Sequence, residues 1–171
     1  LQGLAAHLAD QAPDFRYSAR TRRPPRDPVN AVLSFTYALV LTEIIGALDS
    51  VGLDPQIGFL HGVRSGRPSL GLDVLEEFRP ALADRFTVRL LKLRVLRDSH
   101  FVRTLGGACY LTDEGRGILL KEYESFKDDE VPHRLLGRRV PRWTLPQIQA
   151  TLMARHLRGD LPSYPPYLME P

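Results

Sequence analysis

The sequence predicts a mainly helical fold with little or no β structure. Three observations favour it: residues that commonly begin helices, apolar residues at helical spacing, and one long apolar stretch with a helix-starting signal before it and a glycine after it. A chain of 171 residues with 43% hydrophobic content suffices for one globular core. We therefore expect one compact domain with one or two appendages.

Three segments are expected along the chain. Residues 1–26 hold the end of a truncated helix followed by an arginine- and proline-rich arm. Residues 27–159 form the helical domain, and residues 160–171 form an irregular, proline-rich tail. No internal repeat divides the sequence further.

The first helix of the domain has clear boundary signals. Asp27 is a typical N-cap residue, Pro28 suits the first helical position, and Gly52 ends the run. This helix contains the longest apolar stretch of the chain. Polar residues interrupt that stretch, so we do not expect it to span a membrane.

A second helix is expected from Ser69, a residue that can cap a helix, to about residue 84. Its apolar face contains Leu70, Val74, Phe78, Ala81 and Leu82. The opposite arc carries three carboxylates: Asp73, Glu76 and Glu77. We expect all three to be able to meet one partner.

The remaining elements have weaker signals. Residues 86–96 continue as a strand or a helix, and residues 101–111 form a glycine-containing connection with some strand character. Residues 112–127 form another helix, after which acidic residues and a proline indicate a break. Thr144 with Gln147 is a capping-box pattern that begins the final helix.

The basic residues are clustered rather than mixed with the acidic ones. Lys and Arg number 23 against 20 Asp and Glu, and the basic residues gather at residues 16–26, 85–97 and 134–142. Such patches suit a polyanion. The single cysteine, Cys109, excludes an internal disulfide and favours the reducing cytoplasm.

The arm is the strongest of these basic patches. It carries five arginines between Arg16 and Arg26, and only Asp14 and Asp27 lie nearby to neutralise them. Phosphate is a suitable counterion, and a solvated tether is the alternative. The candidate DNA contacts are Arg20, Arg22, Arg23, Arg26, Arg64 and Arg67.

A histidine lies between glycines in the run of residues 57–62, Ile-Gly-Phe-Leu-His-Gly. An imidazole on a tight loop, followed by carboxylates on a helix, is what a hard divalent cation needs for nucleic-acid chemistry. From the residues alone, His61 could equally be a loop histidine bonded to backbone, and the carboxylates a solvated helix face.

Several blocks in order resemble one protein family. These are residues 22–31 (RRPPRDPVNA), 51–55 (VGLDP), 58–62 (GFLHG) and 67–80 (RPSLGLDVLEEFRP). Together they resemble the CRISPR-associated adaptation integrases, the Cas-one family. The resemblance extends from about residue 15 to about residue 153.

The resemblance implies the C-terminal helical catalytic domain of such a protein. His61 and Glu76 would be ligands of Mg²⁺ or Mn²⁺, with Asp73 sharing the site, and Glu77 would lie at the surface. The glutamate that completes the site in the family should fall just before Leu1. We therefore expect weak or no activity from this chain alone.

The implied activity is that of a metal-dependent DNA endonuclease and integrase. It would insert foreign DNA spacers into the CRISPR array by transesterification, as part of cytoplasmic defence against viruses. Implied partners are double-stranded and branched DNA, a small Cas-two family protein, and a second copy in the full-length protein, but no membrane. The alternative is a non-catalytic helical module that binds nucleic acid and proteins.

Overall fold

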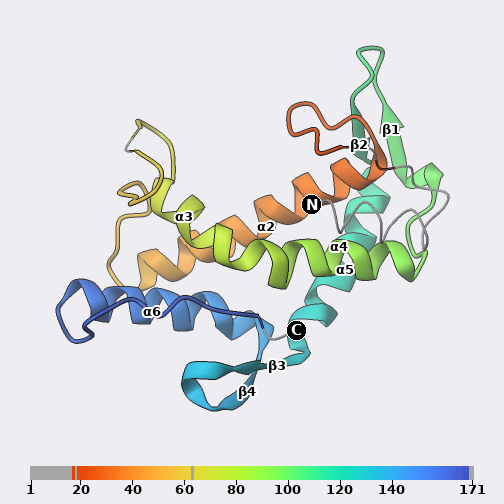
Figure 1. Ribbon diagram of the computed structural model, residues 1–171. Helices are drawn as coiled ribbons and strands as arrows, with labels where there is room; N and C mark the ends of the chain where they lie inside the picture. The colour runs from red at the N-terminus through yellow and green to blue at the C-terminus, as the bar shows by residue number, and fades with distance from the viewer. Residues whose placement is uncertain (1–16, 18, 63, 170–171) are drawn as a thin grey trace. The chain divides into compact units, whose positions relative to one another are not determined.

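The computed structural model describes residue 17, residues 19–62 and residues 64–169, and these are mostly helical (Figure 1). The elements, in chain order, are helix α2 (Pro28–Ser50), helix α3 (Ser69–Phe78), a π-helical segment (Arg79–Asp84), helix α4 (Arg85–Lys92), a 3-10 turn (Asp98–His100), strands β1 (Phe101–Arg103) and β2 (Cys109–Leu111), helix α5 (Asp113–Asp128), strand β3 (Glu130–His133), a 3-10 turn (Arg134–Leu136), strand β4 (Arg138–Pro141), a 3-10 turn (Arg142–Thr144) and helix α6 (Leu145–Leu157). The mainly helical prediction is confirmed.

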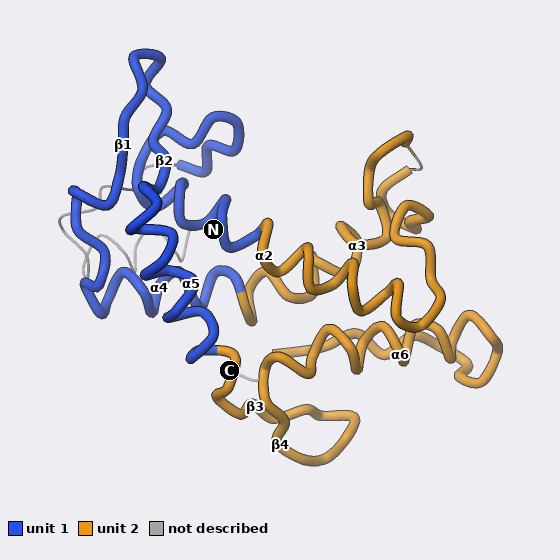
Figure 2. The backbone as a smooth tube through the Cα atoms, turned by 180° about the vertical axis from the view of Figure 1, so that it is seen from behind, with its two compact units in different colours: residues 1–37, 83–126 blue, residues 38–82, 127–171 orange. Residues whose placement is uncertain are grey.

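The chain divides into two compact units (Figure 2). Unit 1 comprises Leu1–Tyr37 and Ala83–Phe126, and unit 2 comprises Ala38–Leu82 and Lys127–Pro171. Helix α2 belongs to both units, since the boundary falls within it. The expected division at residues 26 and 159 stays a prediction.

Unit 1 contains an aromatic cluster and the hairpin of β1 and β2. The Phe86 ring of α4 meets two rings of α5, with centroids 5.1 Å from Tyr123 and 5.3 Å from Phe126. Strands β1 and β2 pair antiparallel, with Phe101 opposite Leu111. This hairpin is the strand character expected for residues 101–111, and Thr112 caps the next helix through a bond from the Gly115 amide.

The start of α2 is fixed by hydrogen bonds around Asn30, which is fully buried. The Asp27 carboxylate accepts the Asn30 amide at 2.8 Å, so the predicted N-cap is confirmed. The Asn30 side chain donates to Asp27 Oδ2 and to the Ala19 carbonyl, and its oxygen accepts from the Thr21 amide. The arm is thereby tied to the first turn of α2.

Unit 2 contains the second half of α2, helices α3 and α6, and the hairpin of β3 and β4. Helix α3 lies against α2 at Gly71, where an added Cβ would be 3.2 Å from the side chains of Leu41 and Ile45. Strands β3 and β4 pair antiparallel, with Val131 opposite Val140. The sequence pattern predicted only a break at this hairpin, and two strands were missed.

Two capping predictions are wrong. Ser69 is the first residue of α3 rather than its cap, and its hydroxyl bonds to a loop carbonyl. Thr144 makes no side-chain cap bond, because its hydroxyl donates to the Pro141 carbonyl at 2.7 Å and completes a 3-10 turn before α6. In both cases the hydroxyl donates to a backbone carbonyl that precedes the helix, that of Gly62 or of Pro141.

Helix α2 is long and apolar enough to cross a membrane, judged by length and composition alone, with a mean hydropathy of 1.9. Within the described part of the chain, no other helix meets that test. The α2 side chains of Val29, Val40, Ile44 and Leu48 are buried inside the protein, as in a core helix.

The Asn30 network gives a stability prediction. Replacing Asn30 by Ala removes a buried side chain that bonds to the Asp27 carboxylate, the Ala19 carbonyl and the Thr21 amide, so the free energy of unfolding should fall by about 2–3 kcal/mol. Urea unfolding followed by circular dichroism measures it. Ser34→Ala is the control: it removes one bond from Arg20 and should cost less than about 1 kcal/mol. Equal losses of stability in the two variants would contradict the structural role given to Asn30.

Candidate active site

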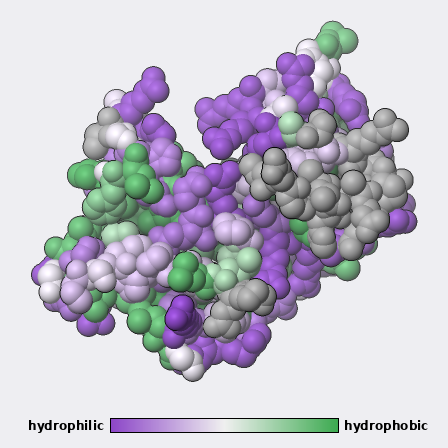
Figure 3. Space-filling view, in the orientation of Figure 1, coloured by the Kyte–Doolittle hydropathy of each residue, from purple (hydrophilic) through white to green (hydrophobic). Residues whose placement is uncertain are grey.

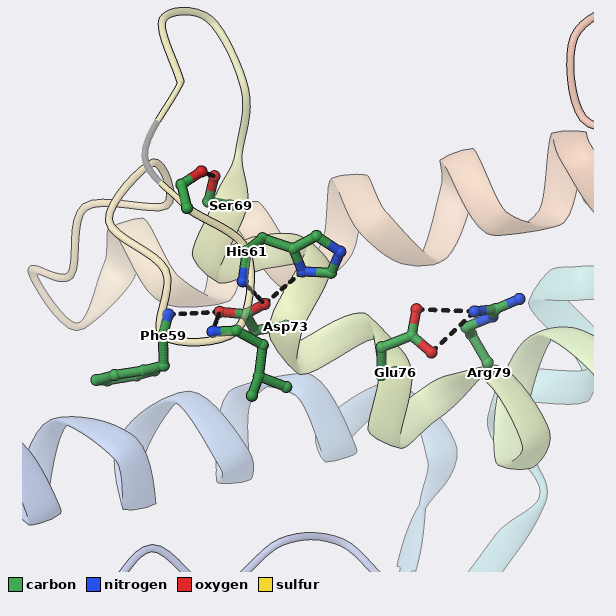
Figure 4. A network of polar contacts seen from close by, with 8 residues as sticks. Phe59, His61, Ser69, Asp73, Glu76 and Arg79 are labelled. Atoms are coloured by element: carbon green, nitrogen blue, oxygen red, sulfur yellow. Dashed lines mark hydrogen bonds and ion pairs between the residues drawn. The ribbon is translucent and has the colours of Figure 1, made fainter.

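The loop that carries His61 is built on one carboxylate, that of Asp73 in α3 (Figure 4). Asp73 Oδ2 accepts the amides of Phe59 at 2.6 Å and Leu60 at 2.9 Å, and Oδ1 accepts the amide of His61 at 3.0 Å. Asp73 is buried. Because three consecutive amides converge on it, the loop can adopt only one path over α3.

Gly58 is required by the same arrangement. A Cβ at this position would lie 2.7 Å from Asp73 Oδ2 and 2.8 Å from the His61 carbonyl oxygen. The Asp73 carboxylate cannot move away without losing its hydrogen bonds to the loop amides. The glycine three residues before the histidine therefore has a steric cause, which is the close approach of the backbone to Asp73.

Asp73 also orients the His61 ring. The Nδ1 atom of His61 lies 2.5 Å from Asp73 Oδ1. An ionised carboxylate can only accept a hydrogen bond, so Nδ1 donates, which leaves Nε2 with its lone pair in the neutral ring. The side chain is 30% exposed, so Nε2 can reach a ligand. A carboxylate behind an imidazole in this way is typical of metal-binding histidines.

The charge of Asp73 is favoured by its surroundings. Burial by itself would raise the pKa of Asp73, but the bonds from the His61 ring and from three backbone amides outweigh burial and lower it. Asp73 is therefore ionised at neutral pH. Both of its oxygens already accept two hydrogen bonds, which suits an orienting group better than a direct metal ligand.

Both ends of the loop are attached to the start of α3. The Ser69 hydroxyl donates to the Gly62 carbonyl at 3.0 Å. The Pro55 carbonyl accepts the amides of Leu70 at 2.8 Å and Gly71 at 3.3 Å. The Pro55 carbonyl satisfies two free amides of the first turn of α3, and all three bonds fix the loop to the helix that carries Asp73.

Glu76 lies on a different part of the α3 surface from the His61 and Asp73 pair. Its carboxylate faces Arg79, whose Nη1 lies 2.7 Å and 2.8 Å from the two carboxylate oxygens (Figure 4). The Glu76 side chain is 50% exposed. The Arg79 side chain is 17% exposed, so the more exposed Glu76 carboxylate is the half of this ion pair that a ligand in solvent can reach.

Glu77 does not lie free at the surface, and that expectation is wrong. Its Oε2 accepts hydrogen bonds from the Tyr167 amide, the Tyr164 hydroxyl and the Gln149 side chain. Burial raises the pKa of Glu77, although these bonds act to lower it. The three carboxylates of α3 thus have three different partners, whereas the helical arc predicted a shared one.

The fit of these residues to a metal is partial. His61 offers an oriented Nε2 and Glu76 an exposed carboxylate, both suitable donors. Across residues 17, 19–62 and 64–169, no three His, Cys, Asp or Glu side chains come together as a cation site. Water, substrate phosphate or a residue from elsewhere would have to complete the coordination.

The expected DNA-contacting arginines fall into two groups. Arg22, Arg23 and Arg26 are exposed in unit 1, whereas Arg20 donates to Asn30 Oδ1 and Ser34 Oγ and lies over a tyrosine ring. Arg20 therefore fastens the arm. In unit 2, Arg64 is exposed and Arg67 half-buried, both in the segment between the His61 loop and α3.

Apolar side chains surround the His61 loop. Ile57, Phe59 and Leu60 are 60%, 61% and 80% exposed, and apolar surface is visible at the left of the face in Figure 3, where the loop and α3 lie in Figure 1. Sequence reasoning noted that residues 57–60 are apolar but missed their exposure, the orienting role of Asp73 and the partner of Glu77. Gly58, three residues before the histidine, was the sequence signal of the close approach to Asp73.

Comparison with known proteins identifies the family. The family model described as CRISPR associated protein Cas1 matches residues 3–125. A protein of Rhodospirillum rubrum named CRISPR-associated endonuclease Cas1 2 is 49% identical over 154 residues, which are 90% of this chain and 45% of that protein. The chain spans about half the length of the first curated relatives it matches.

Solved structures share the fold. A Cas1 protein from Thermotoga maritima superposes with a TM-score of 0.81 at 34% identity, covering 92% of this chain and 48% of that one. A casposase bound to integration product superposes with a TM-score of 0.79 at 23% identity, covering 88% and 45%, which shows the fold alone. By sequence and by fold, this chain belongs to the Cas1 family of CRISPR-associated proteins.

Proposed function

We propose that this chain is the catalytic part of a metal-dependent DNA endonuclease and integrase that inserts foreign DNA into a CRISPR array. The observation that carries the proposal is the Asp73 and His61 pair, in which a buried carboxylate turns the Nε2 of an accessible imidazole outward. Membership of a family whose curated relatives are named endonucleases supports the reaction class.

His61 and Glu76 would hold Mg²⁺ or Mn²⁺, and the bound ion would polarise a phosphoryl oxygen and lower the pKa of the attacking hydroxyl. Asp73 keeps the His61 ring in the tautomer that leaves Nε2 free. Glu76 would offer its half-exposed carboxylate to the ion, beside the Arg79 guanidinium that it bonds in this structure.

The exposed arginines would bind double-stranded and branched DNA by its backbone. Arg22, Arg23 and Arg26 would contact phosphates at unit 1, and Arg64 and Arg67 would do so beside the His61 loop. Such contacts carry little sequence information, so insertion at one place would depend on a second copy of the full-length protein and on a Cas2 partner. We place this assembly in the cytoplasm, away from membranes.

One observation favours a second candidate, a helical module that binds nucleic acid and proteins without catalysis. The described residues contain no complete group of metal ligands, and Glu76 already has a cationic partner in Arg79. The two candidates differ in whether His61 and Glu76 are needed for DNA cleavage, or whether only the arginines matter.

Metal binding is the first prediction of this proposal. Two protein ligands hold a hard cation weakly, so the 171-residue chain should bind Mn²⁺ with a dissociation constant on the order of 10⁻⁴ to 10⁻³ M, and His61→Ala should abolish binding. Isothermal titration calorimetry measures both. His156→Ala removes a histidine of α6 whose Nδ1 lies 3.0 Å from the Leu161 carbonyl oxygen, and it should leave binding unchanged. Equal binding by the parent and His61→Ala would exclude the assigned ligand.

The second prediction concerns DNA cleavage. It is tested in a chimera that has the full length of a relative. In it, this chain replaces the matching segment of the Rhodospirillum rubrum protein. Nicking of branched DNA with Mn²⁺ should be lost in His61→Ala and Glu76→Ala and fall about 10–100-fold in Asp73→Asn, because the imidazole loses its orientation. Asp49→Ala, an exposed carboxylate of α2, is the control. Parent-level nicking by both ligand variants would favour the non-catalytic module.

The arm gives a third prediction, on affinity. Changing Arg22, Arg23 and Arg26 together to Gln should weaken binding of duplex DNA of any sequence, since phosphate contacts are lost. The slope of log affinity against log salt should fall by about 0.9 for each lost contact. Fluorescence anisotropy over a salt series measures it, with the exposed Arg158→Gln of unit 2 as control. An unchanged slope would support the solvated-tether interpretation.

A further inference from the structure

A segment that follows α6 lies against α3 in unit 2. We call residues 160–169 the strap. Glu77 Oε2 accepts the Tyr167 amide at 2.9 Å and the Tyr164 hydroxyl at 3.0 Å, both from the strap. It also accepts the Gln149 amide nitrogen of α6 at 3.1 Å. One carboxylate oxygen therefore links α3 to both the strap and α6.

The strap makes further contacts with the same residues. Gln149, which is fully buried, also donates to the Tyr164 hydroxyl at 2.8 Å and to the Pro165 carbonyl at 3.1 Å. The Tyr167 ring packs against the Phe78 ring, with centroids 5.8 Å apart. The strap thus contacts α3 at two consecutive residues, Glu77 and Phe78.

These contacts lie at the C-terminal end of α3. Its first turn is fixed by the Pro55 and Gly62 carbonyls. Its last residue, Phe78, is followed by the π-helical segment Arg79–Asp84, where the regular α-helical pattern is interrupted. In unit 2, the strap holds the end of α3 that faces this interruption.

The strap and the candidate ligands also border the same cavity. A cavity of about 660 Å³ in unit 2 is lined by Phe59, Asp73 and Glu76 on the side of the candidate site. Strap residues, among them Tyr164 and Tyr167, form another part of its wall. A shift of the strap would therefore change the packing beneath the loop and beside both carboxylates.

We propose that Glu77 is a positioning residue: by fastening the strap to α3, it sets Asp73 and Glu76 for metal binding. Glu77 touches neither substrate nor ion. It directly follows Glu76, and Asp73 lies one helical turn before it, so a small rotation of α3 at Glu77 moves both. The half-buried Glu77 carboxylate accepts hydrogen bonds from the strap and from α6, and these bonds fix the place of the strap relative to α3. The inference rests on the proposed function.

The test compares Glu77→Ala, Glu77→Gln and Tyr164→Phe. In the chimera, Glu77→Ala should raise the Mn²⁺ concentration for half-maximal nicking about 10–100-fold, with a smaller change in the rate at saturating Mn²⁺. Glu77→Gln keeps an oxygen that can accept all three donors and should restore most of the loss. Tyr164→Phe removes one of the three donors, so its Mn²⁺ requirement should lie between those of Glu77→Gln and Glu77→Ala. Asp49→Ala should change nothing.

Hydrogen exchange of the 171-residue chain supplies a readout that needs no activity. Glu77→Ala should speed exchange in the strap and also at the Phe59, Leu60 and His61 amides, which depend on Asp73. Faster exchange in the strap alone, with an unchanged Mn²⁺ requirement, would overturn the proposal. A Glu77→Gln variant that needs as much Mn²⁺ as Glu77→Ala would overturn it as well. If the parent chimera does not nick DNA, the proposed function fails, while exchange at the loop still decides whether Glu77 positions it.

Discussion

The convergence of three backbone amides and one imidazole on the Asp73 carboxylate determines the rest of the candidate site. A buried carboxylate needs several donors to stay ionised, and the loop from Phe59 to His61 supplies them all. The requirement acts in both directions. Asp73 fixes the loop and the tautomer of His61, and the loop keeps Asp73 charged, so neither half of the site exists without the other.

Other features of unit 2 follow from that convergence. The backbone approaches Asp73 so closely that only glycine fits at position 58, and the Ser69 hydroxyl is taken by the loop instead of capping α3. Each carboxylate of α3 then has its own task. Asp73 orients the histidine, Glu76 stays half-exposed in its pair with Arg79, and Glu77 fastens a distant segment. A single helix thereby carries the proposed ligand, an orienting group and an anchor.

The sequence predicted those features that depend on local physics. The α2 helix starts after Asp27 because of a hydrogen bond that spans three residues. The mainly helical fold follows from the helical spacing of apolar residues. The functions of Ser69 and Glu77 were predicted wrongly because each side chain bonds to a segment outside its own helix, and that of Thr144 because its hydroxyl bonds back to Pro141 in a 3-10 turn. For the same reason, the resemblance could name His61 but not the bonds that hold its ring.

The state of the His61 ring tests the account most directly. Two-bond ¹H–¹⁵N NMR spectra of the imidazoles distinguish a ring protonated at Nδ1 from one protonated at Nε2. At neutral pH without metal, the account predicts that His61 carries its hydrogen on Nδ1 and that this preference is lost in Asp73→Asn. A His61 ring protonated at Nε2 in the parent chain would contradict it, since the nitrogen assigned to the metal would then have no free lone pair.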